Sequence, residues 1–76
     1  MTKLPLVTGV EMARLLVRLG FTQLRQKGSH AYFRHPDGRA TVVPLHKGET
    51  IGRGLLRAIL REIDLSPRDY EKLRQK

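Results

Sequence analysis

Hydrophobic and polar residues alternate with a helical period over residues 8–20. Thr8 and Glu11 have the spacing of a capping box, in which each side chain accepts a hydrogen bond from the other residue's backbone N–H, so a helix should begin there. Gly20 should end it, because glycine is common just after a helix C-terminus. The polar residues Glu11, Arg14 and Arg18 recur at i, i+3 and i+7 and so form a single stripe, which predicts a mostly buried helix. The apolar positions are Val10, Met12, Ala13, Leu15, Leu16, Val17 and Leu19.

After Phe21 the hydrophobic period shortens to two, which is typical of β-strands. Three short strands are expected, over residues 22–27, 30–35 and 40–45, and the segments between them have the composition of turns. Strands joined by such short turns should form an antiparallel meander. Leu24 and Phe33 are expected on the buried face of this sheet.

Two more helices are predicted after the strands. The first covers residues 50–63, and the second is short, with Ser66 at its N-cap, Pro67 at its first position and Asp69 in its first turn. Tyr70 and Leu73 lie within the short helix. In the longer helix, Ile51, Leu55, Leu56, Ile59, Leu60 and Ile63 should face inward, and Arg53, Arg57 and Arg61 should form a straight stripe outside.

These elements predict a single α+β domain over residues 1–76. The expected order is α-β-β-β-α with a short C-terminal helix, and the three-stranded antiparallel sheet is covered by helices on one face. A chain of 76 residues buries only about 60% of the surface that it exposes when unfolded, so its core should be thin.

The charge balance narrows the class of partner. Fifteen Lys and Arg residues against seven Asp and Glu residues give a net charge of +8, which favours a polyanion: nucleic acid first, then an acidic protein, then an anionic membrane. The chain has no cysteine, and its three histidines lack metal-ligand spacing, so no metal site and no cofactor are expected. No apolar run is long enough to span a bilayer or to act as a signal peptide, which predicts a cytoplasmic protein.

His30 is the strongest candidate for chemistry, because an imidazole exchanges protons near neutral pH. It begins the second predicted strand, on the face opposite Phe33. Lys27 and Arg34 are placed to neutralise a phosphate, and Gly28 lets a phosphate or ribose approach the backbone. An ordinary exposed strand histidine is the alternative. The predicted exposed face carries Gln23, Arg25, Lys27, His30, Tyr32 and Arg34.

Several other residues have two interpretations each. His46 is either a general acid or phosphate ligand, or a loop histidine that caps the next helix. Ser29 either hydrogen-bonds a phosphate or supports the turn, and Tyr32 either stacks on a base or covers the sheet. His35 is expected to be structural or solvated. The remaining candidates for phosphate contact, which a solvated surface would also explain, are Arg25, Lys47, Arg53 and Arg57.

The chain resembles the HicA (YcfA-like) family of toxin endoribonucleases, which has a double-stranded-RNA-binding-like fold. The resemblance runs nearly from end to end. It is carried by Gly20-Phe21, Gly28-Ser29-His30 with Phe33, Val43-Pro44 with His46, Ile51, Gly54-Leu55 and Leu65-Ser66-Pro67.

This resemblance implies the toxin of a type II toxin-antitoxin module, a metal-independent mRNA interferase that blocks translation. The catalytic histidine of the family corresponds to His30, and the implied partners are mRNA, single-stranded or structured, and a HicB-like antitoxin. His30 would remove the 2′-hydroxyl proton, and cleavage would leave a 2′,3′-cyclic phosphate and a 5′-hydroxyl. There are two competing hypotheses. The protein is either a non-catalytic RNA-binding module or a docking site for an acidic protein.

Overall fold

The computed structural model describes residues 4–74, which form three helices and three strands. All six elements have the predicted type and order, and their ends differ from the predicted ones by at most three residues. In chain order they are α1 (Gly9–Arg18), β1 (Thr22–Lys27), β2 (His30–Arg34), β3 (Ala40–Pro44), α2 (Arg53–Glu62) and α3 (Pro67–Arg74).

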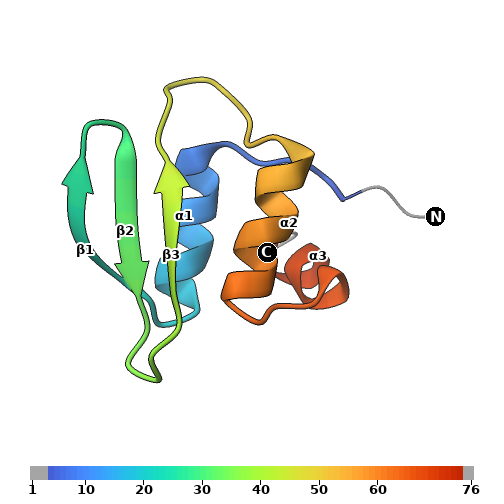
Figure 1. Ribbon diagram of the computed structural model, residues 1–76. Coiled ribbons are helices and arrows are strands. Elements are labelled where there is room, and N and C mark those ends of the chain that lie inside the picture. Colours follow the sequence, from blue (N-terminus) through green and yellow to red (C-terminus); the bar gives the residue numbers. More distant parts are fainter. Residues whose placement is uncertain (1–3, 75–76) are drawn as a thin grey trace.

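The strands form an antiparallel sheet in the order β1-β2-β3, with the helices behind it (Figure 1). α1 packs against the back of the strands, α2 lies beside β3, and α3 packs next to α2. The front of the sheet is covered by no helix of residues 4–74. This arrangement confirms the predicted α+β fold, in which an antiparallel sheet buries one face and exposes the other.

The core lies between the back of the sheet and the apolar faces of the helices. Thr41 is the buried polar side chain among the described residues, and its hydroxyl donates to Glu62 Oε1 at 2.7 Å, so its burial leaves no unpaired group. The largest fully buried side chains are Tyr70, Phe33, Met12, Leu16, Leu56, Ile59, Ile63 and Val43.

Both ends of α1 are closed by local hydrogen bonds. The predicted capping box is present: Thr8 N–H donates to Glu11 Oε1 at 2.8 Å, and Glu11 N–H donates to Thr8 Oγ1 at 3.1 Å. The bond from Thr8 N–H holds the pKa of the Glu11 carboxyl below its ordinary value. At the other end, Gly20 has a φ of +97° and Phe21 N–H reaches Leu16 O, which is a Schellman ending.

Gly9, the first residue of α1, is where the helix meets the sheet most closely. A Cβ at this position would stand 2.1 Å from the carbonyl oxygen of Pro44 and 3.2 Å from the Cα of Leu45. Only glycine allows the helix to begin this close to the backbone at the end of β3.

The predicted burial of α1 was too extensive. Met12, Leu15 and Leu16 are buried, but Val10 and Val17 are 47% and 59% exposed. The helix packs on the sheet along one stripe, so apolar residues on its outer side stay in solvent.

The prediction of which β1 residues lie on the buried face of the sheet was also wrong. Leu24 is 54% exposed, and no residue of β1 is buried. The pairing with β2 shifts between Gln23 and Arg25, so Leu24 is an extra residue in a β-bulge. The register places Gln23 opposite Phe33, on the other face from the one predicted.

The segment before α2 is longer than predicted. Thr50 forms a bridge to Thr8, Ile51 N–H donates to Val7 O at 2.8 Å, and α2 begins only at Arg53 after the N-cap Gly52. Ile51 is buried as predicted, but Leu55 is 43% exposed, because its neighbour Leu56 takes the inward-facing position of the same turn and is fully buried.

The C-terminal helix α3 begins as predicted, with Asp69 N–H donating to Ser66 Oγ at 3.1 Å. Tyr70 is fully buried, and its hydroxyl donates to the carbonyl of Pro5. Burial raises the pKa of this phenol. Tyr70 thereby joins α3 to the segment before α1. Over residues 4–74, no helix combines the length and hydropathy needed to cross a bilayer.

Replacing Gly9 with alanine should destabilise the protein, because the new methyl group would overlap the Pro44 carbonyl. We expect the free energy of unfolding in urea to fall by about 1–3 kcal/mol. Gly54→Ala is the matched control, since nothing lies within 4 Å of its added Cβ. That variant should be equal to the wild type or more stable by up to about 1 kcal/mol. Equal stability of Gly9→Ala and Gly54→Ala would disprove the close contact.

Glu11→Gln should make stability less dependent on pH in acid. Glutamine can still accept the Thr8 N–H bond but carries no charge. Because the folded protein lowers the pKa of Glu11, its carboxylate stabilises the fold above its unfolded pKa, and this contribution is lost as pH falls through the lower folded pKa. In urea titrations the wild type should therefore be more stable at pH 7, and the two proteins should converge near pH 2. A gap that is constant with pH would contradict this.

Candidate functional site

His30 lies at the start of β2, directly after the turn at Gly28 and Ser29. It pairs with Lys27 on β1 and with Pro44 on β3. Paired residues of an antiparallel sheet point to the same side, and alternation places His30 on the side opposite the buried Ala31. The imidazole is exposed on the open face of the sheet, as predicted.

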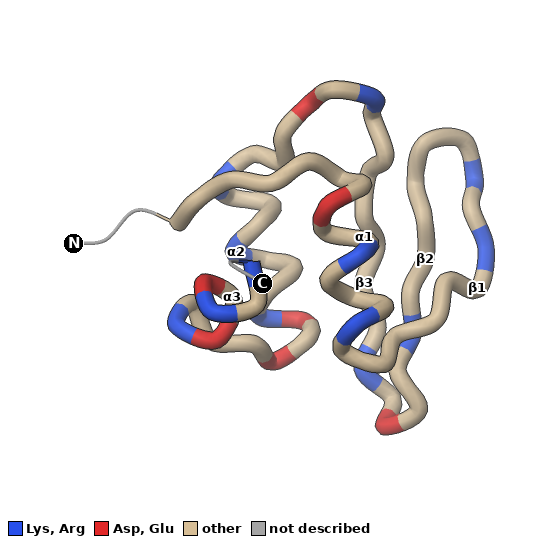
Figure 2. The backbone as a smooth tube through the Cα atoms, turned by 180° about the vertical axis from the view of Figure 1, so that it is seen from behind, with Lys and Arg blue, Asp and Glu red and all other residues tan. Residues whose placement is uncertain are grey.

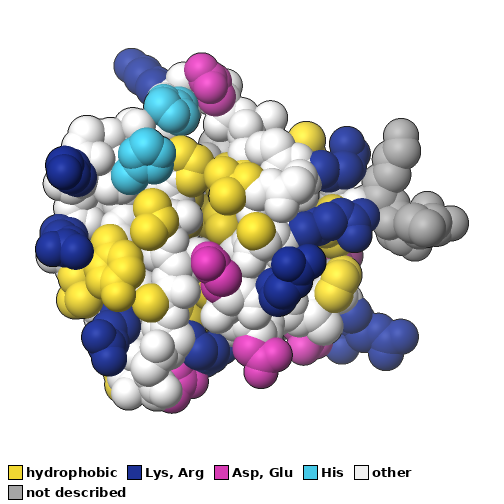
Figure 3. All heavy atoms as spheres, viewed as in Figure 1, with side chains coloured by type: hydrophobic (Ala, Val, Ile, Leu, Met, Phe, Trp, Pro, Cys, Tyr) yellow, Lys and Arg dark blue, Asp and Glu magenta, His cyan; other side chains and the backbone are white. Residues whose placement is uncertain are grey.

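His46 lies next to His30, although His30 begins β2 and His46 follows β3. Leu45 N–H donates to the Ser29 carbonyl, which joins the segment after β3 to the turn before β2. The two imidazole rings are 6.5 Å apart between centroids and meet edge to face at 81°. Figure 3 shows histidine side chains gathered at one end of the open face.

Below the histidine pair, the sheet forms a shallow hollow of about 330 Å³. Arg25 and Tyr32 are cross-strand partners, and the guanidinium carbon of Arg25 lies 5.6 Å from the centre of the Tyr32 ring. This distance is typical of a cation–π contact. The hollow therefore offers cations, an aromatic ring and a histidine together. Its lining residues are Arg25, Lys27, His30, Tyr32 and Val42.

The other predicted site residues surround this hollow or lie apart from it. Gly28 has a φ of +60° and open space around its Cα, and Ser29 is half-buried beside it. Lys47 is exposed directly after His46. Arg34 lies at the far end of β2, on the same face as His30 by alternation.

Arg53 and Arg57 are exposed on α2, and the structure does not bring them to the histidine pair. Arg57 and Arg61 instead line a separate hollow with Leu4, between α2 and the start of α3. Figure 3 shows Lys and Arg side chains over α2 on the same face of the molecule as the histidines. They form a second cationic area.

Acidic residues are absent from the segment that carries the hollow. No Asp or Glu occurs between Thr22 and Arg34, and Figure 2 shows Lys and Arg alone along β1 and β2. Arg25, Lys27 and Arg34 have no carboxylate within 4 Å among residues 4–74. An anion that approached this face would therefore meet uncompensated positive charge.

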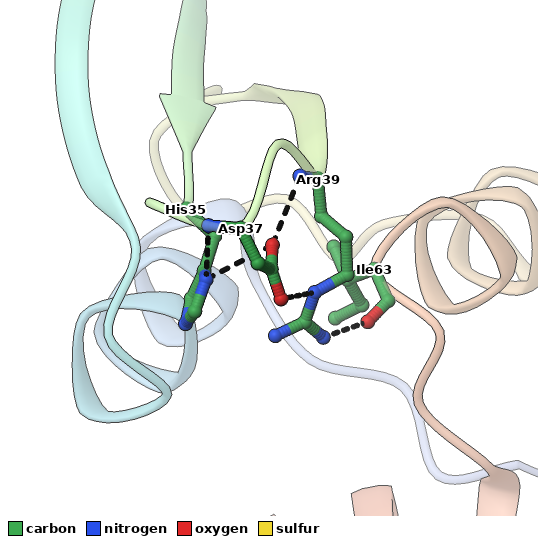
Figure 4. A network of polar contacts seen from close by, with 4 residues as sticks. All are labelled: His35, Asp37, Arg39 and Ile63. Atoms are coloured by element: carbon green, nitrogen blue, oxygen red, sulfur yellow. Dashed lines mark hydrogen bonds and ion pairs between the residues drawn. The ribbon is translucent and has the colours of Figure 1, made fainter.

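His35 has a different role (Figure 4). Its Nδ1 accepts from Asp37 N–H at 3.1 Å and lies 3.0 Å from Asp37 Oδ1, so either protonation state has a partner. Its ring meets Phe21 edge to face at 5.1 Å. Arg39 donates to Asp37 Oδ2 at 2.8 Å and to the carbonyl of Ile63. The backbone N–H of Arg39 holds the pKa of the Asp37 carboxyl below its ordinary value. His35 supports the β2–β3 turn, in line with its structural interpretation from the sequence.

Two residues of the site were missed by sequence reasoning. Val42 is 42% exposed in the floor of the hollow, and the alternation of buried Thr41 and Val43 around it was the available signal. Gly9 sets the position of the segment that leads to His46. Its signal was the occurrence of glycine, a poor helix former, at the first position of a well-capped helix.

No group of three or more His, Cys, Asp or Glu side chains within residues 4–74 is arranged to hold a metal ion. The histidine pair and the hollow are built from imidazoles, cations, one tyrosine and one valine. Such a set can exchange protons, neutralise phosphate and stack on a base.

Comparison with known protein families gives the family of this chain. A family model described as the HicA toxin of bacterial toxin-antitoxin systems matches residues 9–65. No curated protein sequence matches the chain. The match runs from the first residue of α1 to Leu65, which lies after the end of α2, and includes both histidines of the pair. Because it covers more than half of the chain, this protein belongs to the HicA toxin family.

Proposed function

We propose that this toxin is a metal-independent endoribonuclease that cleaves mRNA and so blocks translation, with His30 as the general base. The observation that carries the proposal is the position of His30, exposed beside Lys27 at the end of a cationic hollow free of carboxylates. RNA supplies its own nucleophile in the 2′-hydroxyl, so a proton acceptor and positive charge suffice for cleavage.

In the proposed reaction the His30 imidazole removes the proton of a 2′-hydroxyl group. The 2′-oxygen then attacks the adjacent phosphorus, the bond to the 5′-oxygen breaks, and the products are a 2′,3′-cyclic phosphate and a 5′-hydroxyl. Lys27 lies across from His30 on β1 and stabilises the charge that develops on the phosphate oxygens. A placed base contributes about 10²–10⁴-fold in rate, which predicts a modest enzyme.

The RNA is proposed to lie along the open face of the sheet. Arg25, Lys27, Arg34 and Lys47 would contact phosphates, Gly28 would allow close approach, and Tyr32 would stack on a base. Ser29 is less suited to bind phosphate through its half-buried side chain than to position the site through its carbonyl, which accepts from Leu45 N–H. Arg53 and Arg57 would hold a more distant part of the strand. We expect the protein to act in the cytoplasm, where mRNA is translated.

Family membership implies a cognate antitoxin, and we propose that a HicB-like protein inhibits the enzyme by covering His30. The histidine is exposed at the surface, and the exposed Val42 and Leu24 belong to the same sheet. A domain of this size has little interior through which a signal could travel. A complex in which His30 remained open to solvent would contradict direct masking.

The alternative is a non-catalytic RNA-binding module. The observation that favours it is the second cationic area over α2, apart from the hollow, because one catalytic group does not need this additional positive charge. Such a module would recognise the shape of a folded RNA through phosphate contacts.

His30→Ala should abolish RNA cleavage and retain RNA binding. End-labelled single-stranded RNA would be incubated with each protein in excess EDTA, and fragment ends would be analysed for 2′,3′-cyclic phosphate. The loss should be about 10²-fold or more. Because His30 is exposed, the melting temperature of the variant should match the wild type. Equal cutting by both proteins would indicate a contaminant or another catalytic group, and binding without cutting by the wild type would favour the module.

Lys27→Ala should weaken RNA binding and reduce its dependence on salt. In the His30→Ala background, which avoids cleavage, the slope of log K against log salt should become shallower by about 0.7 for one lost phosphate contact to a single strand. Arg68→Ala, which removes an exposed cation from α3 away from the sheet, is the control and should leave the slope unchanged. Equal changes in both variants would show that net charge alone governs binding.

A further inference from the structure

The two histidines of the open face are free to act on a ligand. His30 and His46 are both exposed, and within residues 4–74 neither imidazole has a hydrogen-bond or ion-pair partner. His35 provides the contrast, because its Nδ1 is occupied by Asp37. The ring nitrogens of the pair are thus available to a substrate.

Backbone contacts bring the two histidines close together. Leu45 N–H donates to the Ser29 carbonyl, and His30 is in register with Pro44, so each histidine is one residue from a cross-strand contact. Gly9 packs against Pro44 and Leu45 from behind the sheet. These contacts hold the backbone on either side of the pair, so the rings approach within 6.5 Å without a bond between them.

This spacing fits a phosphate held between two imidazoles. A proton donor or acceptor must lie within about 2.6–3.2 Å of the oxygen that it serves. Rings 6.5 Å apart leave room for one phosphate group to contact both. In RNA cleavage the attacking 2′-oxygen and the departing 5′-oxygen lie on opposite sides of the phosphorus, so two separate groups are needed to serve them.

We propose that His46 is the general acid that protonates the departing 5′-oxygen. The inference rests on the proposed function, in which His30 is the base. His30 gains the 2′-hydroxyl proton, the 2′-oxygen bonds to phosphorus, and the electron pair of the breaking bond goes to the 5′-oxygen. Protonated His46 gives that oxygen its proton and becomes neutral. Proton exchange with water then restores both imidazoles.

The charged and titratable groups near the pair come from three elements. β1 contributes Arg25 and Lys27, β2 contributes Tyr32, and the loop after β3 contributes Lys47 and Glu49. An acid and a base that must be in opposite protonation states give a bell-shaped dependence of kcat on pH. Loss of the acid removes the alkaline limb, where activity falls because the acid has lost its proton.

The test compares His46→Ala and His46→Gln with the wild type on two RNA substrates. One substrate has the ordinary linkage, and the other has sulfur in place of the departing 5′-oxygen, which leaves readily without a proton. On ordinary RNA both variants should lose about 10²-fold or more in kcat. Glutamine can donate a hydrogen bond to phosphate but cannot transfer a proton, so Gln should be as impaired as Ala.

On the sulfur-containing substrate both His46 variants should approach the wild-type rate and show no alkaline limb, whereas His30→Ala should remain slow. Glu49→Gln, an exposed change in the same loop, is the control and should retain activity on both substrates. Recovery of His30→Ala instead of His46→Ala would overturn the assignment, as would normal activity of His46→Ala on ordinary RNA. His46 variants that stay slow on both substrates would show a binding role only. An inactive wild type would overturn the proposed function itself.

Discussion

The contact between the start of α1 and the end of β3 is the constraint on which the site depends. Gly9 lies so close to the Pro44 carbonyl that no other residue has room, and this contact fixes where β3 ends. Pro44 is in register with His30, and the next residue, Leu45, is hydrogen-bonded to Ser29. The helix on the back of the sheet therefore helps to place the backbone of the two histidines on its front.

One face of the sheet forms the core, and the other carries the exposed cations. The back contributes Phe33 and Val43 to a core that must stabilise a short chain without disulfides. The front carries cations that would repel one another if they were buried, and it tolerates them because water screens exposed charges. A small protein can present such a surface only if the opposite face supplies nearly all of its apolar burial. The alternation of residues in β2 and β3 provides this division directly.

Much of this architecture could be predicted from the sequence, because caps and alternation are local properties. The capping box at Thr8 and the serine cap at Ser66 were found where predicted. Which apolar residues face the core was less predictable. Leu24 was expected in the core, but the bulge in β1 depends on pairing with β2, which a local pattern does not contain. Leu55 and Val17 are apolar and exposed for a similar reason, since the edge of the core is set by which helices meet.

The sequence predicted which residues belong to the candidate site better than it predicted how they are arranged in space. His30 and the cations of β1 were identified from alternation and charge, and the structure groups them. The closeness of His46 to His30 depends on a hydrogen bond between two loops, which sequence spacing does not indicate. Arg53 and Arg57 were also predicted to contact phosphate, and they occupy a second area over α2.

The bulge in β1 has a consequence for solubility. β1 is an edge strand, and an exposed edge offers unpaired backbone groups on which another chain can form a sheet. A bulge interrupts the regular pairing, and Arg25 and Lys27 place charge along the same edge. The cations proposed to hold RNA thus also keep copies of the toxin from joining edge to edge. A protein freed of these charges to weaken its toxicity would lose part of its protection against aggregation.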